Sequence, residues 1–159
     1  MLSAKNIFKF LILVQILILF SVYYIEYAMN IYACKLCKYQ RLPFFFNIVL
    51  LFFLILNKNR FFYFLHVLCI SVIINISIAF YHVGIEREFF KENQACISIE
   101  TPTSEKELLN QLINNQKSDC KEVRFKLFKL SLSELNLIAN IVFLLICVHI
   151  IRNEKKQKN

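Results

Sequence analysis

Four long apolar segments restrict the fold of this 159-residue chain more than any other feature. They cover approximately residues 7–25, 42–57, 61–83 and 132–151. A helix needs roughly 20 apolar residues to cross the ~30 Å hydrocarbon core of a bilayer. In addition, 58% of the chain is hydrophobic, more than a water-soluble core can hide. The sequence therefore predicts an all-α membrane protein, with four transmembrane helices forming one bundle and a single membrane domain over residues 1–159.

The ends of two spans carry recognisable helix signals. Pro43 suits the first turn of the second span, where its missing N–H costs nothing. With about 15 apolar residues at 1.5 Å each, that span covers only about 22 Å, so it must extend or the bilayer must thin. Ser131 and Glu134 have the spacing of a capping box and predict the start of the fourth helix.

Basic residues in the short connecting segments predict the orientation of the bundle. Four spans put both termini on one side, and short segments rich in Lys and Arg stay in the cytoplasm. The amino-terminal segment, the link between spans two and three, and the carboxyl-terminal tail are all basic. We therefore expect cytoplasmic termini and two outward-facing loops, at 26–41 and 84–131.

The formal net charge of +8 does not indicate binding to nucleic acid. Residues 86–130 carry eight acidic and eight basic side chains, so the excess lies in the inner segments and near Cys34. Anionic lipid attracts such juxtamembrane charge. The sequence contains no Gly-rich phosphate loop and no basic array with interleaved aromatics. The lipid bilayer is the expected partner of this charge.

Four of the six cysteines fall in the two outward-facing loops, on the side that bacteria keep oxidising. The other two lie within the third and fourth spans and are expected to pack as small buried hydrophobes. In chain order, the outer cysteines are Cys34, Cys37, Cys96 and Cys120, and the inner ones are Cys69 and Cys147.

The spacing of the outer cysteines favours redox chemistry over a metal site. Zinc sites usually repeat a short Cys-x-x-Cys knuckle or add closely spaced histidines, whereas 23 residues separate Cys96 from Cys120. No metal is therefore expected, although this wider pair could be a structural disulfide. A disulfide between Cys34 and Cys37 closes too small a loop to stabilise the fold much. Their spacing is typical of dithiols that exchange disulfides.

The setting of Cys37 favours a reactive thiolate. It precedes the expected start of the second span, where free backbone N–H groups and the positive end of the helix dipole favour an anion. Lys35, Lys38 and Arg41 add positive charge. A thiolate is the form that attacks disulfides and donates electrons, and a lipid-soluble acceptor could reach it from the bilayer.

These residues resemble the disulfide bond formation protein B (DsbB) family over nearly the whole chain. The segment 34–41, Cys-Lys-Leu-Cys-Lys-Tyr-Gln-Arg, leads into the second span, and the segment 81–86, Tyr-His-Val-Gly-Ile-Glu, ends the third. The second cysteine pair follows, with Cys120 in a Ser-Asp-Cys triplet. The order of both pairs relative to four spans makes the resemblance specific. Ala33 stands where the family commonly has Pro, but every redox atom is present.

The resemblance implies a bacterial inner-membrane thiol oxidase that reoxidises a periplasmic, thioredoxin-like DsbA-type protein and passes the electrons to ubiquinone or menaquinone. It implies that Cys96 receives the partner's attack, that Cys120 is its pair-mate, and that Cys34 exchanges with Cys120. Cys37 would then face the quinone. Arg41 would bind the quinone carbonyl, since Arg stays charged and offers several donors, and His82 is a further candidate for contact with the quinone.

Two other functions stay open on the sequence. One is a quinone reductase of the vitamin K epoxide reductase type, whose quinone-side cysteine pair is expected late in the helical order. The other is a non-catalytic membrane subunit stapled by two disulfides. Trapping a mixed disulfide with a partner protein separates both from the thiol oxidase.

Overall fold

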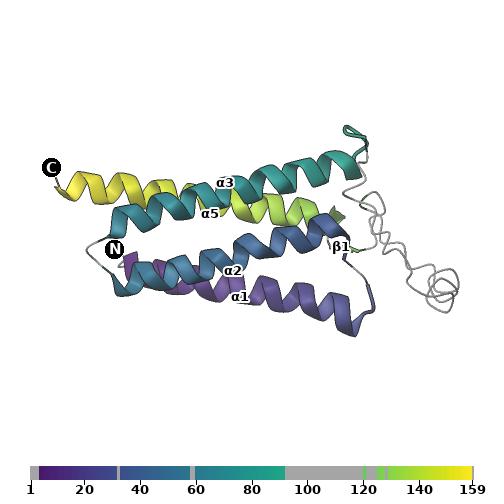
Figure 1. Ribbon diagram of the computed structural model, residues 1–159, viewed down its shortest axis with the longest axis horizontal. Helices are drawn as coiled ribbons and strands as arrows, with labels where there is room; N and C mark the ends of the chain where they lie inside the picture. Colours follow the sequence, from purple (N-terminus) through teal and green to yellow (C-terminus); the bar gives the residue numbers. More distant parts are fainter. Residues whose placement is uncertain are drawn as a thin grey trace, which may run out of the picture.

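A computed structural model shows a bundle of long helices with a small hairpin at one end (Figure 1). The residues that it describes are 4–31, 33–57, 60–91, 120, 125–127 and 129–158. In chain order the elements are α1 (Ala4–Ala28), α2 (Lys35–Leu56), α3 (Phe61–Glu86), β1 (Lys126–Leu127), β2 (Leu130–Ser131) and α5 (Leu132–Lys158). This architecture confirms the expected all-α membrane fold.

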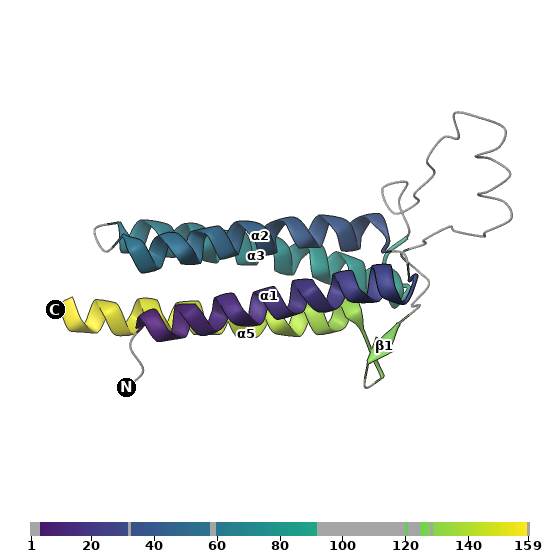
Figure 2. The ribbon, with the colours of Figure 1, turned by 90° about the horizontal axis from the view of Figure 1, so that it is seen from below.

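All four helices are long and apolar enough to cross a membrane. They run alongside one another, with α1 against α2, α2 against α3, and α3 against α5 (Figures 1 and 2). Both termini lie at the same end of the bundle, as four spans require. The hairpin and the segment between α1 and α2 lie at the opposite end.

The bundle is apolar both inside and outside, as expected of helices surrounded by lipid. Large hydrophobic side chains on every helix are about half exposed or more, among them Phe20 (69%), Phe52 (56%), Ile74 (52%) and Leu145 (64%). The core towards the termini contains apolar side chains from all four helices. Its most buried members are Phe8, Leu51, Leu65, Leu68, Val72 and Cys147.

The second helix starts seven residues earlier than the hydropathy pattern predicts. Its N-cap is Cys34, and Lys35–Leu56 spans 22 residues, or about 33 Å at 1.5 Å per residue. A helix of this length crosses the bilayer, so the apparent shortfall disappears. Pro43 consequently lies inside the helix, and its expected place in the first turn was wrong. The apolar run located the span but missed the polar turns of the helix that precede it.

A hairpin and a capping box set the start of α5. Strands β1 and β2 pair antiparallel, with Leu127 opposite Leu130, and Lys129 in the turn has a φ of 68°. Ser131 Oγ accepts the backbone N–H of Glu134 at 3.1 Å, while Glu134 Oε2 accepts the backbone N–H of Ser131 at 2.9 Å. This reciprocal pair satisfies two N–H groups at the helix start and confirms the predicted capping box.

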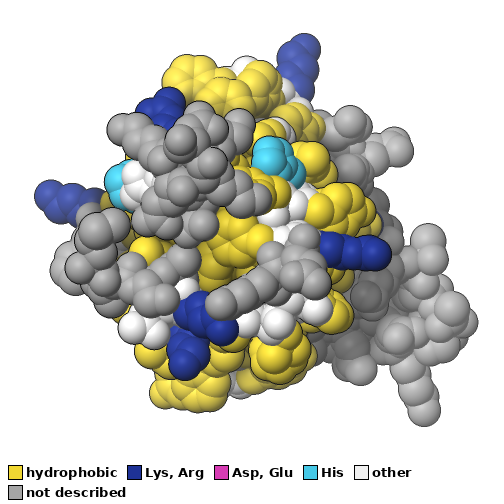
Figure 3. Space-filling model, turned by 90° about the vertical axis from the view of Figure 1, so that its left-hand side faces the viewer, with side chains coloured by type: hydrophobic (Ala, Val, Ile, Leu, Met, Phe, Trp, Pro, Cys, Tyr) yellow, Lys and Arg dark blue, Asp and Glu magenta, His cyan; other side chains and the backbone are white. Residues whose placement is uncertain are grey.

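The end of the bundle that contains both termini is basic. Figure 3 shows Lys and Arg side chains around this face and no acidic side chain among the residues that the structure describes there. By sequence these residues include Lys5 and Lys9 near the start of α1, Arg60 before α3 and Arg152 in α5. That this face meets the cytoplasm stays a prediction from the positive-inside rule.

Candidate active site

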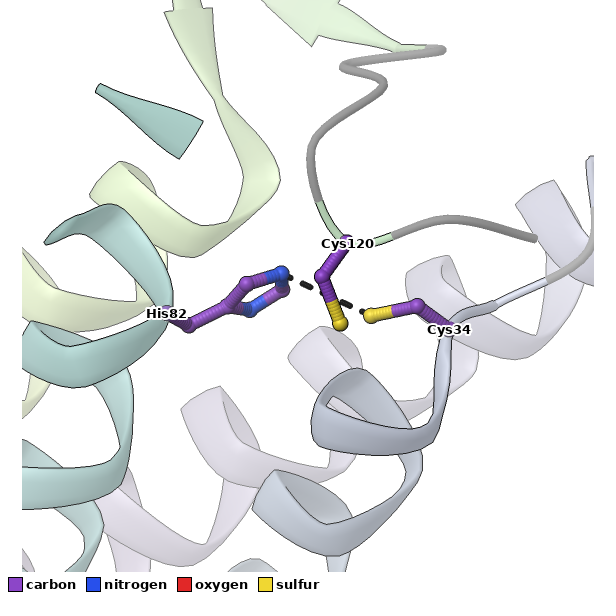
Figure 4. A group of neighbouring side chains, drawn as sticks. All are labelled: Cys34, His82 and Cys120. Atoms are coloured by element: carbon purple, nitrogen blue, oxygen red, sulfur yellow. Dashed lines mark hydrogen bonds between the residues drawn. The ribbon is translucent and has the colours of Figure 1, made fainter. Parts of the chain in front are cut away.

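The candidate site lies at the end of the bundle away from the termini, where Cys34 precedes α2 and α3 approaches its last turn (Figure 4). A small cluster of buried residues, separate from the larger apolar core, forms here from Cys34, Leu36, Ile85 and Cys120. The structure therefore brings a thiol of the first outer loop together with one of the second.

Cys34 is the cysteine that lies at the N-terminus of α2, as its N-cap residue. Its side chain caps α2, and its Sγ accepts the backbone N–H of Cys37 at 3.4 Å. The sequence predicted that the helix N-terminus would favour a thiolate at Cys37, whereas in the structure Cys34 occupies that position. Cys37 is the third residue of the helix and is partly buried.

Several hydrogen-bond donors lower the pKa of Cys34 well below the usual thiol range. The largest contribution is the hydrogen bond from the Cys120 side chain, followed by one from Cys37, and His82 adds a hydrogen bond and a favourable charge. Burial acts in the opposite direction, because it disfavours the charged form, but it is outweighed. Of the two thiols in the Cys-x-x-Cys pair, Cys34 is therefore the one whose surroundings favour the thiolate form.

Cys120 reaches this cluster from the long segment between α3 and α5 (Figure 4). Its side chain is 2% exposed. Cys120 Sγ, Cys34 Sγ and a ring nitrogen of His82 all lie within 4.8 Å of one another. Two thiols and an imidazole are a donor set that Zn²⁺ accepts, so these atoms could also hold a metal ion. The same closeness is what thiol–disulfide exchange between Cys34 and Cys120 requires.

His82 is almost completely buried, at 2% exposure, and connects the thiols to a carboxylate. Its Nε2 lies 3.5 Å from Cys34 Sγ and 3.6 Å from Glu86 Oε1, one helical turn away. Its Nδ1 lies 3.9 Å from Cys37 Sγ. Ser131 of β2 donates to Glu86 Oε2 at 2.6 Å, and Ser133 of α5 donates to the same oxygen. These contacts hold the carboxylate in place, so His82 can exchange protons with either thiol or with Glu86.

Arg41 lies close to these thiols but is paired with an acid from α1. It forms an ion pair with Glu26, and its guanidinium carbon lies 4.8 Å from the centre of the Tyr23 ring. Its Nε and Nη2 are buried and have no hydrogen-bond partner among the described residues. Buried donors of this kind normally find an acceptor. An oxygen-bearing ligand would supply one.

A cavity of about 870 Å³ lies beside the site. Its walls come mainly from α1, α2 and α5, with Leu17, Phe44 and Ala139 among the apolar residues that line them. The thiols, Arg41 and His82 line its polar part. A largely apolar cavity with a few convergent polar groups is typical of a site for a small organic ligand.

Several polar residues near the site were not assigned a role from the sequence, among them Gln40, Asn136, Glu26 and Glu86. Gln40 Nε2 lies 3.4 Å from His82 Nδ1, and Asn136 of α5 donates to Gln40 Oε1 at 2.9 Å. Glu26 is the partner of Arg41. A polar side chain inside or beside an apolar span was the available signal, because such residues are costly in a membrane and usually functional.

The remaining cysteines divide between the core and the undescribed part of the chain. Cys147 is fully buried in the core, and Cys69 packs against it, in agreement with their expected role as small hydrophobes. Cys96, the expected point of partner attack, lies outside the described residues.

A membrane bundle of four helices that brings a Cys-x-x-Cys pair, a third thiol and a buried histidine together at one end has the construction of a membrane thiol oxidoreductase. The chain matches the family described as "Disulfide bond formation protein DsbB" over residues 4–150. It belongs to that family and is therefore a multi-pass membrane oxidoreductase of disulfide bond formation.

The chain is also similar to a protein of Rickettsia prowazekii (strain Madrid E) that is named "Uncharacterized protein RP370". The two are 26% identical over 140 residues, which cover 85% of this chain and 80% of that protein.

Proposed function

We propose that the protein is an inner-membrane thiol oxidase that reoxidises a periplasmic DsbA-type dithiol protein and transfers the electrons to membrane quinone. The observation that carries the proposal is the meeting of Cys34 with Cys120 beside an apolar cavity. In this arrangement, a disulfide relay can end next to a lipid-soluble electron acceptor.

The relay uses the two outer cysteine pairs in turn. The partner's thiolate attacks Cys96, and both electrons of the partner dithiol reduce the Cys96–Cys120 disulfide. Cys120 then attacks Cys34 of the oxidised Cys34–Cys37 pair. An S–S bond forms between Cys120 and Cys34, the bond to Cys37 breaks, and Cys37 leaves as a thiolate. The nearness of the Cys34 and Cys120 sulfurs supports this exchange.

The cavity suits a quinone in both size and chemistry. At about 870 Å³ it falls within the range of small-molecule sites. Apolar residues of α1 and α5 would hold the isoprenoid tail, and Cys37 and His82 line the cavity where the ring would bind. The unpartnered Nε and Nη2 groups of Arg41 are donors that a quinone carbonyl would satisfy. Ubiquinone and menaquinone share this carbonyl chemistry.

Quinone supplies the final oxidant, since it accepts two electrons and two protons to become quinol. Closing a disulfide releases the same number of each, so the overall reaction balances. A DsbA-type partner near −120 mV is itself a strong oxidant, so its reoxidation requires an acceptor of higher potential. His82 and Glu86 are placed to hold a proton beside the thiols.

Quinone-dependent oxidation of a reduced DsbA-type protein by the purified protein in detergent tests this proposal. Loss of quinone absorbance and loss of partner thiols should proceed together in the wild type. Cys37→Ser should abolish quinone reduction, whereas Cys69→Ser, a cysteine of the apolar core, should retain it. Undiminished quinone reduction by Cys37→Ser would overturn the assignment of the electron exit.

A trapping experiment tests the other end of the relay. A DsbA-type variant that retains only its attacking cysteine should form a mixed disulfide with the wild type but not with Cys96→Ser. A mixed disulfide that persists in Cys96→Ser would place partner attack on another cysteine.

A further inference from the structure

Four amide side chains form a hydrogen-bonded chain from the middle of the bundle to His82. We propose that this amide ladder fixes the tautomer of His82, so that the ring proton stays on Nε2 and faces Cys34. The ladder residues are therefore positioning residues for the thiol site. In order along the ladder they are Asn75, Asn140, Asn136 and Gln40.

The direction of the ladder is set by a backbone carbonyl. Asn140 Nδ2 lies 2.8 Å from the main-chain oxygen of Asn136. A carbonyl oxygen only accepts hydrogen bonds, so the NH₂ group of Asn140 must be the group that faces it. The side-chain oxygen of Asn140 then faces the other way, where it accepts from Asn75 Nδ2 at 3.1 Å. This rung therefore has only one possible orientation.

The orientation of each amide group along the ladder fixes the orientation of the next one. Asn140 Nδ2 also donates to Asn136 Oδ1 at 2.7 Å. Asn136 is thereby left with its NH₂ group towards Gln40, to whose Oε1 it donates at 2.9 Å. Gln40 must then present Nε2 to His82 Nδ1, 3.4 Å away. An amide NH₂ only donates, so Nδ1 of His82 accepts, and the neutral ring carries its proton on Nε2.

The surroundings of the two ring nitrogens agree with this assignment. Nε2 lies 3.5 Å from Cys34 Sγ and 3.6 Å from Glu86 Oε1, which both accept a proton when ionised. Nδ1 lies 3.9 Å from Cys37 Sγ, whose thiol can donate to it. The opposite tautomer would direct a lone pair at both the Cys34 thiolate and the Glu86 carboxylate. The ladder thus helps to make Cys34 the thiol that accepts a hydrogen bond from His82 and Cys37 the thiol that donates one.

Among the described residues, few ionisable groups contact His82, so its tautomer can be attributed to the ladder. From the start of α2 they are Cys34 and Cys37, from its own helix Glu86, and from the second outer loop Cys120. Arg41, the nearby cation, is paired with Glu26. Ser131 of β2 and Ser133 of α5 donate to Glu86, Asn136 of α5 donates to Gln40, and the charged Glu134 of α5 is paired with Arg87.

Gln40→Glu is the most direct test, because it keeps the shape and the acceptor for Asn136 but replaces the donor at Nδ1 with a carboxylate oxygen. ¹⁵N spectra of the reduced, histidine-labelled protein report which ring nitrogen is protonated, and His82→Gln assigns the signal. Above the pH at which the ring becomes neutral, wild-type Nδ1 should be bare and Nε2 protonated. In Gln40→Glu, Nδ1 should gain a proton. A protonated Nδ1 in the wild type, or a bare Nδ1 in Gln40→Glu, would overturn the proposal.

Asn136→Leu and Asn47→Leu form a matched pair of variants that separates positioning from simple packing. Asn136→Leu breaks the ladder one rung away from the imidazole, so the fixed tautomer should be lost. The ratio of Cys34 thiolate to thiol, followed by thiolate absorbance near 240 nm, should fall about tenfold at a given pH on the titration curve. Asn47→Leu removes a buried amide that lies outside the ladder and should change neither signal. Equal changes of the two signals in both variants, or a change in the stability of Asn136→Leu without any change in its tautomer, would show that the ladder only packs the helices.

The inference rests on the thiol chemistry proposed above, yet its readouts need neither quinone nor a partner protein. If wild-type His82 carries its proton on Nε2 but the protein does not reduce quinone, the proposed function alone is rejected. If the protein reduces quinone but Nδ1 carries the proton, the ladder alone is rejected.

Discussion

Neutralising Glu26 should destabilise the bundle strongly, because it leaves the Arg41 guanidinium buried without a countercharge. The side chains of Arg41 and Glu26 are 11% and 10% exposed, respectively, and the Tyr23 ring covers the guanidinium. Two of the guanidinium nitrogens already lack a hydrogen-bond partner among the described residues. Loss of the carboxylate would remove the main interaction that compensates for burying this charge.

The expected loss of unfolding free energy follows from the burial of both charged groups. Removing one partner of a buried ion pair costs about 3–5 kcal/mol, and the slight exposure here places Glu26→Gln near 3 kcal/mol. Arg41→Met should cost about the same, since it leaves the carboxylate alone. Removing both leaves no unpaired charge. The double variant should therefore lose less stability than the sum of the single ones, with a coupling energy of about 2 kcal/mol.

Unfolding by SDS titration in mixed micelles, followed by circular dichroism, measures these free energies. Arg87→Met is the control, because Arg87 pairs with Glu134 while its own side chain is 59% exposed. An exposed pair contributes about 0.2–1 kcal/mol. The reasoning fails if the two single losses simply add in the double variant, or if Arg87→Met costs as much as Glu26→Gln.

Three further predictions concern one residue each. The lowered pKa of Cys34 means that its thiolate absorbance should persist as the pH falls below the ordinary thiol pKa of about 8.5. Cys34→Ser should remove this signal. Because the unfolded thiol binds its proton more tightly, the reduced protein should gain stability as the pH rises towards that value. Asn47→Leu should raise the unfolding free energy by about 1–3 kcal/mol, since both polar side-chain atoms of Asn47 are buried without a partner among the described residues. Ser131→Ala should lower the unfolding free energy by about 1 kcal/mol in the same titration, through loss of the α5 cap.

The sequence predicted the four spans because the length and apolar character of a segment are local properties. The capping box of α5 was predictable for the same reason, since its two residues lie three positions apart. The start of α2 was not, because its first turns are polar and the helix begins at the Cys34 cap. Hydropathy does not register a helical turn made of Lys, Tyr, Gln and Arg.

The candidate site was predictable as a set of residue types and much less as a set of contacts. Cys34, Cys37, Arg41 and His82 were all named from their motifs. Their neighbours were not named, because the contact of Gln40 with Asn136 joins residues 96 positions apart. Such contacts depend on how each helix is rotated about its axis, which a nearly uniform apolar pattern leaves open.

By itself, the sequence predicted four membrane-spanning helices and, as an expectation, two cysteine pairs on one side of the membrane. Apolar length and cysteine spacing are enough for that, since each acts through a short stretch of chain. Only the tertiary structure decided that Cys34 lies next to Cys120, that Arg41 pairs with Glu26, and that a chain of amides from three helices ends at His82. These features depend on the relative rotation and depth of packed helices, and that arrangement is set by the whole bundle together.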